Sequence, residues 1–313
     1  MNVVVAIVGP TAIGKTKLAF SLAKEWPIEV ISMDSAQVYR NMNIGTAKPS
    51  LEERQELTHH LVDIIDPTEF FSVSQFISLT KELIPTIWAR GKIPVLVGGT
   101  FLYLHGIYQG ISSMPERSPL IRKKIEEEAE ENGWPSLHQK LAIIDPDRAA
   151  IINKNDRQRI QRALEIYYVT GKKMSECFTN KHRPFSKTPF WICGLNVNER
   201  QSIHEMISIR FKNMIKMGLI EEVKQLATMY KLHEDTAPMK CVGYRQVMHY
   251  LMKNQSMEEL IARGTAATRQ LAKRQLTWIK KTPCNTVLWP YDDPDAGKKL
   301  NQELGRYMLL RNR

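Results

Sequence analysis

One short stretch near the N-terminus constrains the fold more than any other part of the chain. Residues 3–8 are all apolar, which is typical of a strand buried inside a parallel sheet. The next octet matches the phosphate-binding pattern G-x-x-x-x-G-K-[ST] at every fixed position. It reads Gly9-Pro10-Thr11-Ala12-Ile13-Gly14-Lys15-Thr16. Apolar residues at 18, 19, 22 and 23 then have helical spacing, so the stretch predicts an α/β fold, a P-loop NTPase-like parallel sheet flanked by helices.

The fixed positions of the octet explain how it would hold a phosphate. Gly9 and Gly14 let the backbone turn so that successive N–H groups point inward, and the helix starting near Lys15 adds its positive dipole end there. We expect Lys15 on the terminal phosphate oxygens and the Thr16 hydroxyl on a magnesium ion. The octet does not identify the phosphorylated molecule.

A second strand is expected at residues 29–33, and Asp34 follows it directly. Functional groups in open α/β sheets gather at the carboxyl ends of strands, so Asp34 should face the phosphate loop. Two chemical roles are open: a magnesium ligand, or a proton acceptor for a nucleophile held beside the phosphate. A third interpretation is an Asx turn that closes the strand.

The βαβ alternation of a parallel sheet continues with a helix at 74–90 and an apolar strand at 93–97. This strand ends at Gly98-Gly99-Thr100. The glycines permit close approach of a ligand to the backbone beside the Thr100 hydroxyl, or they form a tight turn, and both interpretations are compatible with the sequence.

Metal sites are not expected from the histidines or the cysteines. His59-His60 precede a short strand expected at 61–65, and adjacent residues of a strand face opposite ways, so both imidazoles are interpreted as structural. The cysteines at 177, 193, 241 and 284 have no C-x-x-C spacing, which favours packing roles in a reduced, cytoplasmic setting. No run of 18 apolar residues predicts a membrane span.

The character of the chain changes near residue 116. We expect residues 116–186 to form a helical insertion, with helices at 118–133 and 135–170 and then a basic loop, and residues 1–115 plus 187–313 to form the catalytic core. Within the insertion, neighbouring glutamines and arginines share one helix face, which binds a partner or is simply solvated. This face comprises Gln158, Arg159, Gln161 and Arg162, backed by Ile160.

Positive charge is concentrated outside the P-loop segment. Residues 1–113 carry 9 lysines and arginines against 10 acidic residues, whereas residues 114–313 carry 35 against 23. A polyanion-binding protein needs such an excess and a small-molecule kinase does not, although charge for solubility alone is an alternative. After a strand at 190–195, helices are expected at 199–217, 219–230 and from 240, and the most basic helix covers 268–278.

Several motifs spread over nearly the whole chain together resemble the bacterial tRNA dimethylallyltransferases, also called tRNA isopentenyltransferases. The octet alone is shared by many unrelated enzymes, but the motifs at residues 34–40 and 269–275 are specific to this family. Residues 171–187 and the tail after Pro283 match the family poorly, and the C-terminal zinc finger of eukaryotic members has no counterpart. The motifs are residues 9–16, 34–40, 45–49, 97–100, 158–162, 242–245 and 269–275.

The resemblance implies transfer of a dimethylallyl group from its diphosphate to the exocyclic amine of the adenosine immediately 3′ of the anticodon in tRNA. Asp34 would accept the amine proton, and Thr100 would orient the Asp34 carboxylate. Arg210 would be a second diphosphate clamp beside Thr16 and Mg²⁺. Arg269, Lys273 and Arg274 are weaker candidates for the clamp. The implied diphosphate-binding set is Gly9, Thr11, Ala12, Ile13, Gly14, Lys15, Thr16 and Arg210.

The resemblance also implies a monomer that binds the tRNA anticodon arm and flips out the target base. Residues near the P-loop would bind the base, and basic residues elsewhere would hold the arm. The implied tRNA-binding set is Asp34, Ser35, Ala36, Gln37, Thr100, Arg122, Gln158, Arg159, Ile160, Gln161, Arg162, Lys240, Cys241, Val242, Gly243, Tyr244 and Arg245.

Three alternatives stay open on the sequence. A P-loop phosphotransferase acting on a metabolite or nucleotide would share the octet, Asp34 and magnesium. A related prenyltransferase would modify free adenine nucleotides. A non-catalytic RNA-binding protein would keep its tRNA affinity after loss of Lys15.

Overall fold

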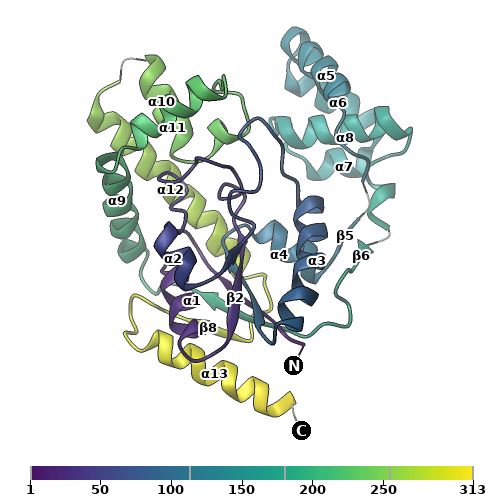
Figure 1. Cartoon of the computed structure of the whole chain (residues 1–313). Helices are drawn as coiled ribbons and strands as arrows, with labels where there is room; N and C mark the ends of the chain where they lie inside the picture. Colours follow the sequence, from purple (N-terminus) through teal and green to yellow (C-terminus); the bar gives the residue numbers. More distant parts are fainter. Residues whose placement is uncertain (1, 113, 180, 254, 312–313) are drawn as a thin grey trace. The chain divides into compact units, whose positions relative to one another are not determined.

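The computed structural model describes residues 2–112, 114–179, 181–253 and 255–311. These residues form two compact units (Figure 1). Unit 1 comprises residues 1–106 and 185–313, and unit 2 comprises residues 107–184. The boundaries expected from the sequence were residues 116 and 186.

Unit 1 is built on a six-stranded sheet in the order β3-β2-β4-β1-β7-β8. All neighbouring strands are parallel, and Gly98 at the end of β4 lies level with both Val8 and Met33. The loops that follow β1, β2 and β4 therefore leave the same edge of the sheet, which confirms the predicted α/β class. The strands are β1 Val4–Val8, β2 Ile28–Met33, β3 His59–His60, β4 Ile93–Gly98, β7 Phe190–Leu195 and β8 Thr286–Leu288.

Helices of unit 1 cover both faces of this sheet, and every residue of β1 is buried, as in the interior of a parallel sheet. Helices α1 and α13 lie together beside the sheet (Figure 1), and their buried leucines pack with Val5 and Ile7. The helices are α1 Lys15–Ala23, α2 Leu51–Glu56, α3 Val73–Ala89, α4 Phe101–Tyr108, α9 Arg200–Lys216, α10 Leu219–Met229, α11 Tyr244–Lys253, α12 Met257–Ile279 and α13 Ala296–Arg311, with a 3₁₀ turn η2 at Pro238–Lys240.

The prediction of a short strand at residues 61–65 is wrong. The strand is instead β3, His59–His60, and Leu61 and Asp63 directly after it have φ angles of 59° and 57°. Left-handed backbone cannot continue a strand. Both imidazoles form hydrogen bonds within the protein: His60 Nε2 lies 2.7 Å from Glu29 Oε2, and His59 Nδ1 lies 2.6 Å from the Leu57 carbonyl oxygen.

Unit 2 is mainly helical. The prediction of one continuous helical stretch at residues 135–170 is wrong, because this part of the chain forms three helices. Asp145 accepts a hydrogen bond from Arg148 N and Pro146 occupies the first turn of α7, while Asp156 caps α8, so each boundary has its own N-cap. The elements are β5 Ile111–Ser112, α5 Pro119–Asn132, α6 Trp134–Ile144, α7 Pro146–Ile151, α8 Arg157–Thr170, η1 Glu176–Thr179 and β6 Lys181–His182.

All four cysteines are free. No group of three or more His, Cys, Asp or Glu side chains among the described residues is placed to hold a metal ion. No helix in the described part of the chain has the length and apolarity that crossing a membrane requires.

We predict that Gly98→Ala destabilises unit 1. A Cβ at Gly98 would lie 2.0 Å from the Met33 carbonyl oxygen, and that backbone cannot move without breaking the β2–β4 pairing. The free energy of unfolding should fall by about 1–3 kcal/mol, measured by urea unfolding. Gly305→Ala is the control: its Cβ would make only an ordinary 3.8 Å contact with Trp26, and it should raise helix stability by about 0.5–1 kcal/mol. Equal stabilities of the two variants would contradict the prediction.

Candidate functional site

A cavity of about 790 Å³ lies in unit 1. Its lining begins with the P-loop and includes the residues that directly follow β2 and β4. Helices α9 and α12, the loop at residues 45–49 and the segment that leads into α11 supply most of the remaining wall. The cavity therefore brings together the carboxyl ends of the strands, where functional groups gather in α/β proteins.

The P-loop turns through two residues with left-handed backbone. Gly14 has a φ of 94° directly before α1, and Ala12 has a φ of 68° although it carries a Cβ. Ile13 is fully buried in the core beneath the loop, so only its backbone can face a ligand. Thr16 is exposed in the first turn of α1.

The ammonium group of Lys15 lies against the loop itself. Lys15 Nζ donates to the carbonyl oxygens of Gly9 at 3.2 Å and Pro10 at 2.8 Å. Burial and the positive charge of Arg210 lower the pKa of Lys15 to about 8, with Asp34 acting in the opposite direction. Burial also lowers the pKa of Arg210, and Asp34 again opposes this. Two cations and one carboxylate therefore interact within the cavity.

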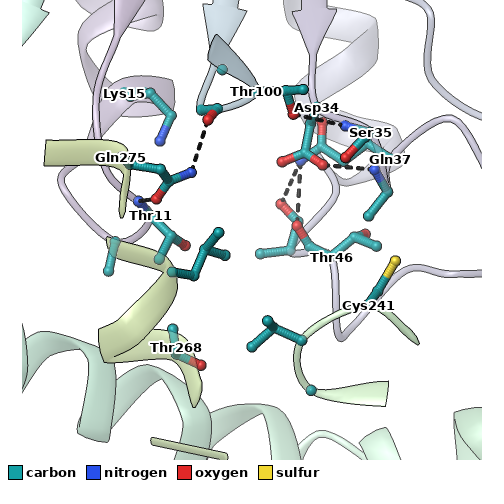
Figure 2. A pocket seen from close by; sticks show the side chains of 18 of the residues that line it. Thr11, Lys15, Asp34, Ser35, Gln37, Thr46, Thr100, Cys241, Thr268 and Gln275 are labelled. Carbon is teal, nitrogen blue, oxygen red and sulfur yellow. Dashed lines mark hydrogen bonds between the residues drawn. The ribbon is translucent and has the colours of Figure 1, made fainter. Parts of the chain in front are cut away.

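Asp34 does form the Asx turn that the sequence left open. Its Oδ1 accepts a hydrogen bond from Ala36 N at 2.8 Å, while Oδ2 accepts none from any residue that the structure describes. Thr100 Oγ1 accepts from Ser35 N at 3.1 Å, which ties the end of β2 to the end of β4 (Figure 2). The turn leaves one carboxylate oxygen of Asp34 available for a second role.

Gln37 is engaged inside the protein. Its Oε1 accepts from the Ser32 hydroxyl at 2.9 Å, and its Nε2 donates to the carbonyls of Thr46 and Ala47, both at 3.4 Å. The latter two contacts are long and therefore weak. The amide of Gln37 thus closes the turn after β2 onto the 46–47 loop.

The segment around α11 contains both cavity residues and exposed residues. Cys241, Val242 and Gly243 line the cavity, and Lys240 at its edge and Arg245 are exposed. Tyr244 also lines the cavity, although its side chain is fully buried.

Tyr244 supports the loop that follows β2 through Glu222. The Tyr244 hydroxyl donates to Glu222 Oε1 at 2.6 Å, and the same carboxylate accepts from the backbone N–H groups of Asn43, Ile44 and Gly45 at 2.8–3.3 Å. A Cβ at Gly45 would lie 2.4 Å from the Tyr244 ring. Loop and ring are therefore in direct contact.

The basic face expected on α8 in unit 2 is only partly exposed. Arg122 and Arg162 both bind the buried carboxylate of Glu165, at 2.9 and 2.7 Å. Gln161 Oε1 accepts from Arg122 at 3.1 Å, and Ile160 is fully buried. The fully exposed members of the expected set are Gln158 and Arg159.

Two residues that contact the P-loop were missed as site candidates, and only the first, Gln275, lines the cavity. Gln275 contacts the P-loop from α12; it lies inside the basic block at 269–275, but attention to charge favours its Arg and Lys neighbours. Tyr291 contacts the P-loop from the segment after β8, and it stands in the tail, where no pattern distinguishes it. Neither contact has a local sequence signal, because each joins residues more than 260 positions apart.

Two family models match the chain. The model described as IPP transferase matches residues 37–282, and the model described as isopentenyl transferase matches residues 1–64. The chain belongs to the IPP transferase family. Similar curated proteins are named tRNA dimethylallyltransferase, which confirms the resemblance. That of Ralstonia pickettii is 46% identical over 285 residues, covering 89% of this chain and 88% of the relative, and that of Methylobacillus flagellatus is 47% identical, covering 90% of each.

Solved structures of family members have the same fold. The full-length tRNA isopentenylpyrophosphate transferase of Bacillus halodurans is 36% identical with a TM-score of 0.70, and the match covers 100% of both chains. A eukaryotic dimethylallyltransferase acting on tRNA is 28% identical with a TM-score of 0.81, and the match covers 100% of this chain and 80% of that one. The alternative of a P-loop phosphotransferase is therefore not favoured.

We predict that affinity for an alkyl diphosphate falls as the pH rises above about 8. The lowered pKa of Lys15, about 8, means that the free protein loses this positive charge there, so binding must take up a proton again. An alkyl diphosphate suits the test because the last ionisation of a phosphate ester has a pKa of ~6, so the charge of the ligand itself hardly changes above pH 8. Calorimetric titration without metal should show the affinity falling toward tenfold per pH unit.

The control for this titration is Lys15→Met, which should bind more weakly and show no transition near pH 8. Lys17→Ala, at an exposed position, should keep the transition. An affinity of the unmodified protein that is the same at pH 7 and pH 9.5 would show that Lys15 does not titrate in this range.

Proposed function

We propose that this chain transfers a dimethylallyl group from dimethylallyl diphosphate to the exocyclic amine of the adenosine on the 3′ side of the anticodon in tRNA, giving N6-isopentenyladenosine and diphosphate. The observation that carries the proposal is the convergence of Lys15, Arg210 and Asp34 on one cavity. Cations suit a leaving diphosphate, and a carboxylate suits an amine that must lose a proton. Membership of the family supports the same reaction.

The P-loop would hold the diphosphate as it leaves. Negative charge grows on the bridging oxygen while the bond to the allylic carbon breaks, and donors already aimed at that oxygen stabilise the charge by about 3 kcal/mol each. Lys15 and Arg210 are partly buried cations, and partial burial strengthens their interaction with the diphosphate. The N-terminus of α1 adds its backbone N–H groups.

Magnesium fits the same place. The exposed Thr16 hydroxyl in the first turn of α1 is an oxygen ligand of the kind that Mg²⁺ prefers, with substrate oxygens and water completing the shell. Bound there, the ion would neutralise charge on the leaving diphosphate.

Asp34 would act as the general base. Its Oδ1 is held by Ala36 N, so Oδ2 remains for the amine proton. Thr100 would act indirectly, because its hydroxyl oxygen accepts from Ser35 N next to Asp34 and thereby fixes the turn. A positioned carboxylate contributes about 10²–10⁴-fold to such a step.

Contact with the anticodon arm is proposed from exposed polar and basic residues. Lys240 and Arg245 in unit 1, with Gln158 and Arg159 in unit 2, are exposed. Their contacts with phosphates would offset the few kcal/mol needed to unstack the target base. We further propose that the protein acts as a monomer in the cytoplasm, where its tRNA substrate is used.

We predict that Asp34→Asn lowers the turnover number by about 10²–10⁴-fold and changes tRNA affinity only a few-fold, since a base acts mainly in the transition state. Labelled dimethylallyl diphosphate and unmodified tRNA give the rate, and a filter assay gives the affinity. Asp66→Asn, an exposed carboxylate paired with Arg40, is the control and should leave both unchanged. Label appearing in free adenine nucleotide and not in RNA, or weaker tRNA binding with unchanged turnover, would contradict the proposal.

We predict that Arg159→Ala weakens tRNA binding and makes its salt dependence shallower by about 0.7–0.9 in log–log slope, the loss of one phosphate contact. Its melting temperature should not change, because Arg159 makes only an exposed pair with Asp156. Arg162→Ala is the contrast: it leaves part of the buried Glu165 charge unpaired, so its main effect should be a lower melting temperature. An unchanged salt slope for Arg159→Ala would exclude the phosphate contact.

A further inference from the structure

The P-loop is held from outside by the side chain of Gln275. Thr11 N donates to Gln275 Oε1 at 2.8 Å, and Gln275 Nε2 donates to the Gly99 carbonyl at 3.0 Å (Figure 2). Gln275 is only 8% exposed, and a Cβ added at Gly99 would lie 2.2 Å from its Nε2. The carboxamide therefore fills the space between the loop after β1 and the end of β4.

The next residue of the loop is held by Tyr291. The Tyr291 hydroxyl donates to the carbonyl oxygen of Ala12. The ring packs against the core formed by β1, α1 and α13, so the hydroxyl has a fixed position. Burial raises the pKa of Tyr291 to about 12, with Arg210 acting in the opposite direction, and the hydroxyl therefore keeps its proton at neutral pH.

These two contacts coincide with the least favourable backbone conformation of the loop. Ala12 has a φ of 68°, in the left-handed region that disfavours any residue with a Cβ. Gln275 accepts from the N–H of Thr11, directly before the strained residue, and Tyr291 donates to the carbonyl oxygen of Ala12 itself. Strained conformations persist where the surroundings determine them strongly.

We infer that Gln275 and Tyr291 are positioning residues that hold the Thr11–Ala12 segment of the P-loop in its diphosphate-binding shape before the ligand arrives. Both act on loop backbone and not on substrate. A loop already in its bound shape loses less conformational freedom on binding, which raises affinity. The inference rests on the proposed function for the identity of the ligand, and it makes the segment after β8 part of the site.

The first test measures binding of inorganic diphosphate with Mg²⁺ by calorimetry. Tyr291→Phe keeps the ring and removes the hydroxyl, so the dissociation constant should rise about three- to tenfold, the loss of one hydrogen bond. Gln275→Met, similar in shape, should give a rise at least as large. The dissociation constant for tRNA and the melting temperature of Tyr291→Phe should stay unchanged.

The control for Tyr291→Phe is Tyr307→Phe. Tyr307 packs on the same core, and its hydroxyl donates to the Phe190 carbonyl at 3.5 Å, away from the P-loop. Its removal should not change diphosphate binding. Unchanged diphosphate binding in Tyr291→Phe, or an equal loss in Tyr307→Phe, would overturn the inference.

A double-mutant cycle tests whether Tyr291 acts through the strain at Ala12. Glycine adopts the left-handed region freely, so in the Ala12→Gly background Tyr291→Phe should weaken diphosphate binding less than twofold. An effect as large as in the unmodified background would mean that the hydroxyl acts by another route, such as through Arg210, and would overturn the inference.

Failure of this inference and failure of the proposed function have different signs. Binding of inorganic diphosphate does not depend on transfer to RNA. Coupling between Tyr291 and Ala12 in a protein that leaves tRNA unlabelled would retain the inference and refute the proposed function. Normal labelling of tRNA together with unchanged diphosphate binding in Tyr291→Phe would do the reverse.

Discussion

The parallel pairing of β1 with β4 and β7 is the constraint on which the rest of unit 1 depends. Because all six strands run the same way, their carboxyl ends meet at one edge, and the loops there must turn within a small space. Gly98 shows how small this space is, since a single Cβ would touch the Met33 backbone. The P-loop, Asp34 and Thr100 are neighbours because the sheet leaves them no other place.

The charges in the cavity suit a leaving group that departs as an anion. Burial lowers the pKa of both Lys15 and Arg210, the positive charge of Arg210 lowers that of Lys15 further, and Asp34 acts in the opposite direction on both. A diphosphate relieves the repulsion between the two cations.

The fold was predictable from the sequence where the signal is local. Residues 3–16 contain a strand, a phosphate loop and a helix start in succession, so the α/β class and the P-loop followed directly. The prediction joined the three helices of residues 134–170 into one, because the helical pattern is nearly continuous and only the capping residues Asp145 and Asp156 separate the helices. The strand was predicted two residues too late, at 61–65, because Leu61 and Asp63 have left-handed backbone although neither is a glycine, the residue that usually marks such a turn.

The site was predictable only in part, for a physical reason. Charge marks residues that can bind a polyanion, but it does not show which are already neutralised. Arg122 and Arg162 bind the buried carboxylate of Glu165. The pair with Arg162 has the local i,i+3 spacing, but the pair with Arg122 joins residues 43 positions apart and leaves no trace in local sequence. Contacts such as that of Gln275 with Thr11 are equally invisible in the sequence.

The close contact of Gly45 with the Tyr244 ring limits the order in which substitutions can accumulate. A larger residue at position 45 is tolerated only after the ring at position 244 has become smaller. These two positions are therefore expected to vary together among descendants of this chain.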